Sequence, residues 1–409
     1  MNAAALPAPG SLAGVTVLDL SRVLAGPYAA QMLADLGATV IKIENPRDPD
    51  VSRGFPPYLT DGEEEFSAYY AQYNRGKLGL GLDLSTPDGV AVLKDLVRSA
   101  DVLVENFRPG TMDRLGVGYD VLREINPRLV YTAISGYGRT GTRSRRPAFD
   151  NTAQAAGGLW SMNGSPGEDP VRVGVTIGDL SATLFAVIGT LAALRHAEST
   201  GTGQVVDVAQ VDSIVALTET AVVEYTVAGE VARPNGNEHA WVKPYELFEC
   251  ADGQVFFGAY TDKLWNAACD LFGEPQHKSD SEIDTMRKRI DPEVYARRVK
   301  PIVAGWLRER TKADLEEMAG DVVPLTAIKD IGEVVDDPGT AERDMIVEAD
   351  YGRLGTLRMF GQPIKLSQTP ATPARTANRF AEHADQVLAD LAGYDAERIA
   401  ALRAAGVLP

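Results

Sequence analysis

The chain has 409 residues, and at roughly 150 residues per domain this length corresponds to two or three domains with an extensive interior. Hydrophobic residues make up 44% and charged residues 24%, close to average globular usage, which excludes a disordered or fibrous chain. The 40 Lys and Arg residues against 57 Asp and Glu residues give a net charge of −17, which opposes binding to nucleic acid or to an anionic membrane. An anionic ligand therefore needs a local positive site.

Targeting and redox signals are sparse. Cys250 and Cys269 form no disulfide framework, CxxC pair or set of four metal ligands. The most apolar stretch, Leu180–Leu194, is 15 residues long, shorter than the about 20 needed to cross a bilayer, and predicts a buried helix. Met1–Gly10 lacks the basic and apolar regions of a secretory signal. We expect a cytoplasmic protein without a membrane partner.

The first half of the chain alternates between two hydrophobic periodicities. We expect strands at 15–20, 38–43, 101–104, 129–134 and 205–209. Between them we expect helices at 28–36, 90–99 and 118–125 and a long helix at about 180–198. This alternation predicts an α/β fold with a parallel sheet covered by helices. A further helix is expected at about 211–228.

The pattern changes after about residue 233. Two apolar runs, 245–250 and 254–258, flank a turn, and a charged helical stretch follows at about 262–320, which together indicate a smaller α+β domain. A pair of strands within 345–359 and a helical region at 385–405 then return to the first domain. We therefore assign residues 1–213 to the first part of a large domain, 214–337 to a small domain with its linkers, and 338–409 to the large domain.

Common motifs for dinucleotide, hydrolase and zinc sites are either missing or lie in the wrong structural context. Gly136–Gly141 matches GxGxxG after a strand, but the following residues are Arg-rich and end in proline, so no helix opens to hold a pyrophosphate. GxSxG is missing from the sequence, and the histidines have no metal-like companions, which disfavours a serine hydrolase and a zinc enzyme. The basic run that includes Arg139, Arg143, Arg145 and Arg146 suits a phosphate-rich ligand or a solvated loop.

Asp179 is the most informative acid. It follows the strand-like segment Val173–Gly178 and stands at the start of the apolar helix. A carboxylate in this place is either a helix N-cap or a nucleophile. The two roles are compatible, because helix N–H groups would hold the carboxylate in its ionised form.

Short segments along nearly the whole chain resemble, in their order and spacing, the class III CoA-transferase (CaiB/BaiF) family, which includes formyl-CoA transferases. These segments are Leu18–Pro27, Leu36–Glu44, Asn74–Lys77, Val104–Gly110, Ser135–Gly138 and Gly201–Asp207, with weaker similarity at Pro244–Tyr245, Asp252–Gly253 and Gly406–Val407.

The resemblance implies a Rossmann-like large domain built from both termini, a smaller domain between them, and an interlocked, ring-shaped homodimer. It also implies that Asp179 attacks an acyl-CoA thioester, giving a mixed anhydride and then an aspartyl-CoA thioester from which a carboxylic acid acceptor takes CoA. CoA is then a cosubstrate, and no tightly bound cofactor and no metal are expected.

The same resemblance implies a set of CoA-binding residues. Val23, Leu24 and Ala25 match positions at the thioester end, Asn45, Leu82, Asn106 and Phe107 match positions at the adenine end, and Arg114 matches a phosphate-binding position. Lys77 and the basic loop with Arg145 lie close to matched positions. Phe107 also fits the role of a core aromatic residue.

Departures from the family pattern narrow the expected chemistry. Formyl-CoA:oxalate members have a glutamine where this chain has Leu24, which disfavours formate and oxalate. The related α-methylacyl-CoA racemases have an acid/base histidine where this chain has Phe149, whose ring cannot exchange a proton. Asp150 either orients groups near Asp179 or is a structural turn acid. We expect transfer of CoA between acids, for example from succinyl-CoA or another dicarboxylyl-CoA; the alternatives are a racemase and a non-catalytic CoA-thioester binding protein.

Overall fold

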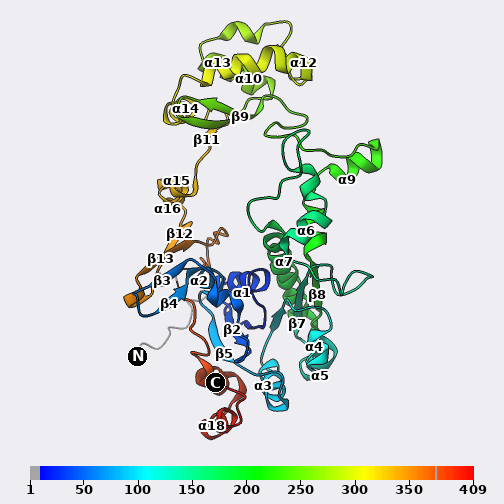
Figure 1. Ribbon diagram of the computed structural model, residues 1–409, viewed down its shortest axis with the longest axis vertical. Helices are drawn as coiled ribbons and strands as arrows, with labels where there is room; N and C mark the ends of the chain where they lie inside the picture. Colours follow the sequence, from blue (N-terminus) through cyan, green and yellow to red (C-terminus); the bar gives the residue numbers. More distant parts are fainter. Residues whose placement is uncertain (1–9, 374) are drawn as a thin grey trace. The chain divides into compact units, whose positions relative to one another are not determined.

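Six short apolar segments form a sheet in which every strand is parallel to its neighbours (Figure 1). The computed structural model describes residues 10–373 and 375–409. The strands of this sheet are β1 (Thr16–Asp19), β2 (Thr39–Glu44), β5 (Leu78–Gly81), β6 (Val102–Glu105), β7 (Val130–Ser135) and β8 (Val205–Ala209). Their spatial order is β5-β2-β1-β6-β7-β8, which is the Rossmann order 3-2-1-4-5-6 when the strands are counted along the chain. The predicted mixed α/β fold with a parallel sheet is confirmed.

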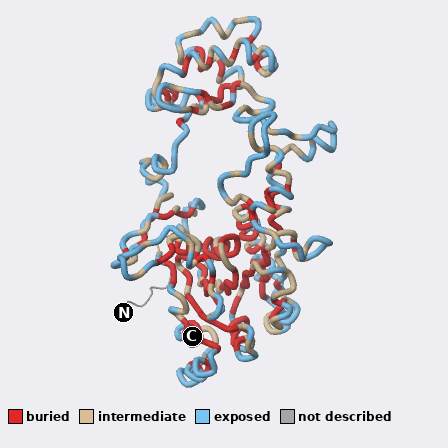
Figure 2. The backbone as a smooth tube through the Cα atoms, in the orientation of Figure 1, coloured by how far each residue is buried: buried red, intermediate tan, exposed pale blue. Residues whose placement is uncertain are grey.

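Helices cover both faces of the sheet because successive residues of each strand point to opposite sides. Val17 packs in one core cluster with residues of α1 and α7, whereas Leu18 packs in another with residues of α3, α5, α17 and α18. Figure 2 shows these central strands as largely buried. The bounds of the main helices are α1 (Ala25–Asp35), α3 (Pro87–Val97), α5 (Tyr119–Ile125), α7 (Ile177–Thr200), α17 (Ala384–Ala392) and α18 (Ala396–Ala404).

The remaining elements of this unit are short. They are β3 (Tyr58–Thr60), β4 (Glu65–Ser67), α2 (Ala68–Asn74), α4 (Thr111–Arg114), α6 (Asp150–Ala156), α8 (Gln210–Ala216), α16 (Pro338–Glu342) and the antiparallel pair β12 (Ile346–Asp350) and β13 (Thr356–Phe360). By its internal contacts, the first unit comprises residues up to Leu159, Val173–Val222 and Pro338–Pro409.

The second unit comprises Trp160–Arg172 and Val223–Asp337. It contains a three-stranded antiparallel sheet of β9 (Tyr245–Cys250), β10 (Gly253–Gly258) and β11 (Leu325–Ala327). Its helices are α10 (Asp262–Leu271), α11 (Met286–Arg289), α12 (Pro292–Val294), α13 (Lys300–Leu307), α14 (Lys312–Ala319) and α15 (Ile331–Val335). Its core is aromatic, with Trp265, Trp306 and Phe257 buried together. The sequence did not indicate that residues 160–172 group with this unit.

Helix α7 is the longest element, with 24 residues. By length and composition it could cross a membrane, and it is the one described helix that could. Half of its most apolar window is buried, and the alanine-rich side of the helix packs against α1 and the sheet. It is therefore a core helix of the first unit.

Two sequence predictions about local structure are wrong. The expected helix at 211–228 ends at Ala216, because the Thr218 hydroxyl donates to the Val215 carbonyl at 2.8 Å and Glu219 adopts a left-handed φ of 52°. A short helix α9 (Ala221–Val223) and a π-helical turn follow. The strand-like segment ending at Gly178 is not a strand, because the Gln154 side chain, rather than a neighbouring strand, hydrogen-bonds its backbone at Val173 and Val175.

Candidate active site

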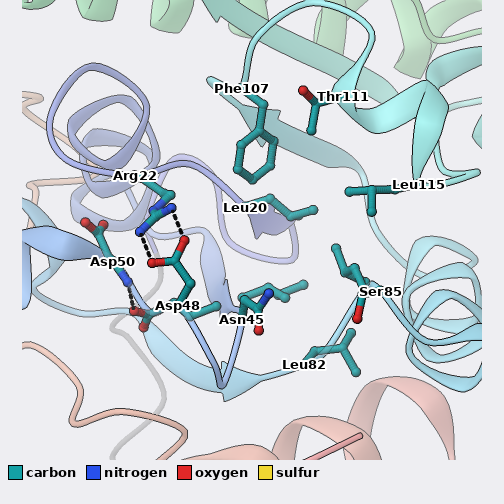
Figure 3. A pocket seen from close by; sticks show the side chains of 13 residues that line it. Leu20, Arg22, Asn45, Asp48, Asp50, Leu82, Ser85, Phe107, Thr111 and Leu115 are labelled. Carbon is teal, nitrogen blue, oxygen red and sulfur yellow. Dashed lines mark hydrogen bonds and ion pairs between the residues drawn. The ribbon is translucent and has the colours of Figure 1, made fainter.

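The loops that follow four neighbouring strands surround a pocket of about 170 Å³ (Figure 3). Arg22 follows β1, Asn45 follows β2, Leu82 follows β5 and Phe107 follows β6. Strands β1 and β6 are neighbours at the point where the strand order reverses, and open α/β sheets bind ligands at this switch point. The pocket is therefore the expected ligand site of the sheet.

Three of the predicted CoA-binding residues line this pocket: Asn45, Leu82 and Phe107. Figure 3 shows the Phe107 ring pointing into the same space as Leu115. The Phe107 backbone N–H donates to Glu105 at 2.7 Å, which fixes this aromatic wall. Phe107 also packs against the core, so it is both a pocket-lining residue and a core aromatic residue. An aromatic and aliphatic lining with a polar rim suits a planar heterocycle.

Asn106 does not line the pocket but fixes its entrance. Its side-chain amide accepts a hydrogen bond from the Arg22 N–H and donates one to the Arg22 carbonyl, both at 2.8 Å. The Arg22 guanidinium in turn pairs with Asp48 at the rim of the pocket (Figure 3). Asn106 therefore holds the loop after β1 against the loop after β6.

Two of the predicted cations lie on the surface. Arg114 is the last residue of α4, and its guanidinium donates at 3.0 Å to the hydroxyl of Thr111, a pocket residue. Arg145 is exposed in the loop between β7 and α6 and is not a pocket residue.

Lys77 differs most from its predicted role. Its ammonium has no exposed surface and pairs with Asp19 at 2.7 Å, with further hydrogen bonds to Asn74 and the Pro27 carbonyl. It is thus part of a buried charge cluster below the loop after β1 and faces away from solvent. The prediction of direct contact between Lys77 and CoA is at odds with this structure.

Asp179 lies in the first turn of α7 but is not its N-cap, so the N-cap prediction is wrong. The N-cap is Thr176, whose side chain makes no capping hydrogen bond. The Gly178 N–H donates instead to Asp150 at 2.7 Å, so that the first residue of α6 caps α7 from outside. A Cβ atom at residue 178 would lie 2.9 Å from that Asp150 oxygen, which explains the glycine.

The charge on Asp179 is destabilised by its surroundings. Burial, together with the nearby negative charge of Asp150, raises the pKa of Asp179 to about 7, while a hydrogen bond from Gln210 opposes this shift. Burial raises the pKa values of Tyr69 and Tyr73 on α2, and the charge of Asp179 adds to both shifts. A poorly solvated carboxylate that ionises near neutral pH is a good nucleophile.

A buried hydroxyl connects this turn to the loop after β1. The Thr183 side chain, one turn beyond Asp179, is hydrogen-bonded to the Ala25 carbonyl at 2.9 Å and to the Asp179 carbonyl at 3.0 Å. Ala25 begins α1, and Leu24 at its N-cap provides no side-chain hydrogen bond. Among the described residues, the N–H groups of Ala25 and Gly26, the first two of α1, have no hydrogen-bond partner, and Pro27 has no N–H. Ala25 is thus linked to the Asp179 backbone through Thr183, and Val23, Leu24 and Ala25 do not line the pocket itself.

No sequence motif marks Gln210 and Thr183, which hydrogen-bond the Asp179 side chain and backbone. Gln210 comes directly after β8, and Thr183 is one of many small residues in an apolar helix. Only the parallel arrangement of β7 and β8 suggests that residues after β8 approach those near β7. Among the described residues, no group of three or more His, Cys, Asp and Glu side chains could hold a metal ion.

Charge reversal of Arg114 tests the phosphate-binding prediction. We expect Arg114→Glu to raise the apparent KM for a CoA thioester about tenfold or more and to change kcat much less, because a phosphate contact remote from the reacting carbon supports binding uniformly. Arg123→Glu, an exposed arginine on the neighbouring α5, is the matched control. An unchanged KM in Arg114→Glu would refute its placement.

Comparison with known proteins identifies the family of this chain. Residues 12–384 match the model of CoA-transferase family III. A succinyl-CoA:mesaconate CoA-transferase of Haloarcula marismortui is 38% identical over 392 residues, which covers 94% of this chain and 97% of the relative. A succinate–glutarate CoA-transferase of Agrobacterium fabrum is 35% identical over 383 residues, covering 93% and 95%. The crystal structure of a CaiB/BaiF family protein from Brucella suis superimposes with a TM-score of 0.82 at 30% identity, covering 94% of this chain and all of the other. The chain is a CoA-transferase and belongs to CoA-transferase family III.

Proposed function

We propose that this enzyme moves CoA from a dicarboxylyl-CoA, such as succinyl-CoA, to a second carboxylic acid by covalent catalysis on Asp179. This proposal rests mainly on the environment of the Asp179 carboxyl. It is poorly solvated, is hydrogen-bonded by Gln210, and lies beside the uncapped start of α1. The dicarboxylate substrates are supported by the names of the relatives from Haloarcula and Agrobacterium.

Each half of the reaction exchanges one acyl bond for another. An Asp179 oxygen attacks the thioester carbonyl carbon, the C–S bond breaks, and CoA leaves as a thiolate, giving a mixed anhydride. The thiolate then attacks the aspartyl carbonyl and releases the donor carboxylate, leaving an aspartyl-CoA thioester. The acceptor carboxylate attacks this thioester, and the released thiolate attacks the acceptor's acyl carbon and restores Asp179. No net proton transfer is required.

The surrounding groups support these steps electrostatically. The N–H groups at the start of α1 are donors for the oxyanion that forms when Asp179 attacks, and the positive end of the helix favours that charge. Gln210 orients the carboxyl through its hydrogen bond. In this proposal the pocket lined by Asn45, Leu82 and Phe107 holds the adenine, and Arg114 and Arg145 meet the phosphates.

We also propose that the enzyme acts as a homodimer. In the first unit, α7 carries the exposed side chains Leu184, Phe185 and Ile188, the last 62% exposed, and Phe149 is 81% exposed. Apolar surface of this kind marks an interaction site. We expect light scattering to give a dimer mass for the wild type and a smaller mass or aggregation for Ile188→Glu. A wild-type monomer that is fully active would contradict the homodimer.

The substrates are identified by one experiment in D₂O. The enzyme is incubated with a set of acyl-CoAs that includes succinyl-CoA and a set of mono- and dicarboxylic acids that includes oxalate, and every CoA thioester is read by mass spectrometry. We expect a new dicarboxylyl-CoA thioester. Deuterium at the α-carbon of 2-methylacyl-CoAs without a new thioester would instead indicate a racemase, and binding with neither change would indicate a non-catalytic protein.

A further inference from the structure

We propose that Asp50 is a positioning residue for the loop after β1: its buried carboxylate holds Val23 in a left-handed backbone conformation, two residues before Ala25, which Thr183 links to the Asp179 backbone. This role rests on the proposed function, because it requires residues 23–25 to face the reacting thioester. Asp50 belongs to a short segment after β2 and is not part of the nucleophile's own turn.

The conformation of Val23 is the first observation. Its φ is +69°, a region that L-residues rarely occupy and that a β-branched side chain disfavours further. The next residue, Leu24, has φ −133° and ψ −68° at the N-cap of α1. Such a backbone persists only when the surrounding structure holds it, and strained residues of this kind concentrate at functional sites.

Asp50 supplies that support directly. Both oxygens of its carboxylate accept hydrogen bonds from the Val23 N–H, at 3.1 and 3.2 Å. The same carboxylate pairs with Lys42 at 3.0 Å, and neither side chain has exposed surface. Ser52 adds two more hydrogen bonds, from its N–H and its hydroxyl. Although burial opposes ionisation, the Lys42 ammonium and the Ser52 donors hold the pKa of Asp50 at about 2, so the carboxylate stays charged.

The rest of the loop is held from other strand ends. Lys42 donates to the Ser21 carbonyl, and the Ser21 N–H donates to Asp19, which itself pairs with Lys77. Asp19, Lys42, Asp50 and Lys77 therefore form one buried charge cluster of two acids and two bases. Asn106 holds both backbone groups of Arg22 in the same way.

The end of this loop is linked to the backbone of Asp179 by hydrogen bonds. Ala25, two residues after Val23, accepts the hydrogen bond from Thr183, which is also hydrogen-bonded to the Asp179 carbonyl. A change in the Val23 backbone therefore moves the start of α1 relative to Asp179. A misplacement of about 1 Å at a reacting centre is enough to cost roughly 100-fold in rate.

A purely structural role for Asp50 makes a different prediction. Breaking a buried ion pair destabilises a fold wherever the pair lies. Asp35 provides the matched control, because its carboxylate pairs with Arg75 at 2.8 Å with equally buried side chains at the opposite end of α1. If Asp50 were merely structural, Asp50→Asn and Asp35→Asn would lower stability and activity alike.

The test measures both variants with succinyl-CoA and glutarate, and also follows amide hydrogen exchange in the peptide that covers residues 20–28. For Asp50→Asn we expect kcat to fall about 100-fold with a KM within about threefold of wild type, and exchange at residue 23 to accelerate. For Asp35→Asn we expect kcat to stay within about threefold of the wild-type value. Asp50→Asn/Val23→Gly should regain about tenfold of the lost kcat, because glycine adopts the left-handed conformation without strain.

Other results overturn the proposal. These are equal kcat losses in Asp50→Asn and Asp35→Asn, unchanged exchange at residue 23, or no recovery with Val23→Gly. If Asp50→Asn does not fold, Asp50→Glu keeps a charge for Lys42 while displacing the carboxylate, and full kcat in that variant would refute the role. A wild type without transfer would refute the proposed function, whereas faster exchange in Asp50→Asn would still establish that Asp50 holds the loop.

Discussion

Replacing Asp179 with alanine should abolish CoA transfer, with a loss of kcat of about 1,000-fold or more, because no other group then carries the acyl and CoA intermediates. Binding of free CoA, followed by calorimetry, should persist, since the pocket at the ends of β1, β2, β5 and β6 does not include Asp179. The nucleophile and the binding pocket are thus separable by mutation.

Asp212→Ala is the matched control for this loss. Asp212 also lies in the first turn of a helix, α8, but its side chain is exposed. We expect near wild-type turnover from it. More than a few per cent of wild-type turnover in Asp179→Ala would remove the nucleophile role from Asp179, and the loss of CoA binding in that variant would contradict the separation of the two sites.

The pH dependence of kcat/KM should reveal the unusual ionisation of Asp179. Because burial and Asp150 raise its pKa to about 7, and only the ionised carboxylate attacks, kcat/KM should fall about tenfold per pH unit below that value. Asp150→Asn removes the neighbouring charge but keeps an oxygen for the Gly178 N–H. It should therefore move the acid limb to lower pH by about one unit.

Asp113→Asn controls for a general change in charge, because Asp113 is exposed on α4. Its profile should match the wild type. An acid limb near pH 4 in the wild-type enzyme would show that Asp179 is well solvated in the working enzyme, and an unshifted limb in Asp150→Asn would assign the raised pKa to burial alone.

The sheet and its flanking helices were predictable because their signals are local. The apolar runs at 16–19, 39–44 and 102–105 and the periodic helices between them are set by side-chain spacing along one segment. The strand order, with its switch point between β1 and β6, was not predicted and comes from the structure. The pocket residues Asn45, Leu82 and Phe107 were found through the resemblance to a family and not through spacing.

The failed predictions involve contacts between distant segments. Asp179 reads as an N-cap in the sequence, but Asp150, 29 residues earlier, takes that role because α6 packs against the start of α7. Lys77 lies close to a matched CoA-binding position in the sequence, but its ammonium is buried and pairs with Asp19 and Asn74. Gln210 contacts Asp179 because α8, which Gln210 begins, packs against α7. Such pairings depend on tertiary structure, which no single segment encodes.

Chemical trapping of the aspartyl-CoA thioester tests the covalent role of Asp179 most directly. The enzyme is mixed with succinyl-CoA without an acceptor, treated with borohydride, digested and mapped by mass spectrometry. Borohydride reduces an aspartyl thioester to homoserine, so we expect homoserine at residue 179 in the wild type. If the enzyme transfers CoA at its normal rate but residue 179 is unmodified, or the modification is at Asp150, the covalent role of Asp179 is contradicted.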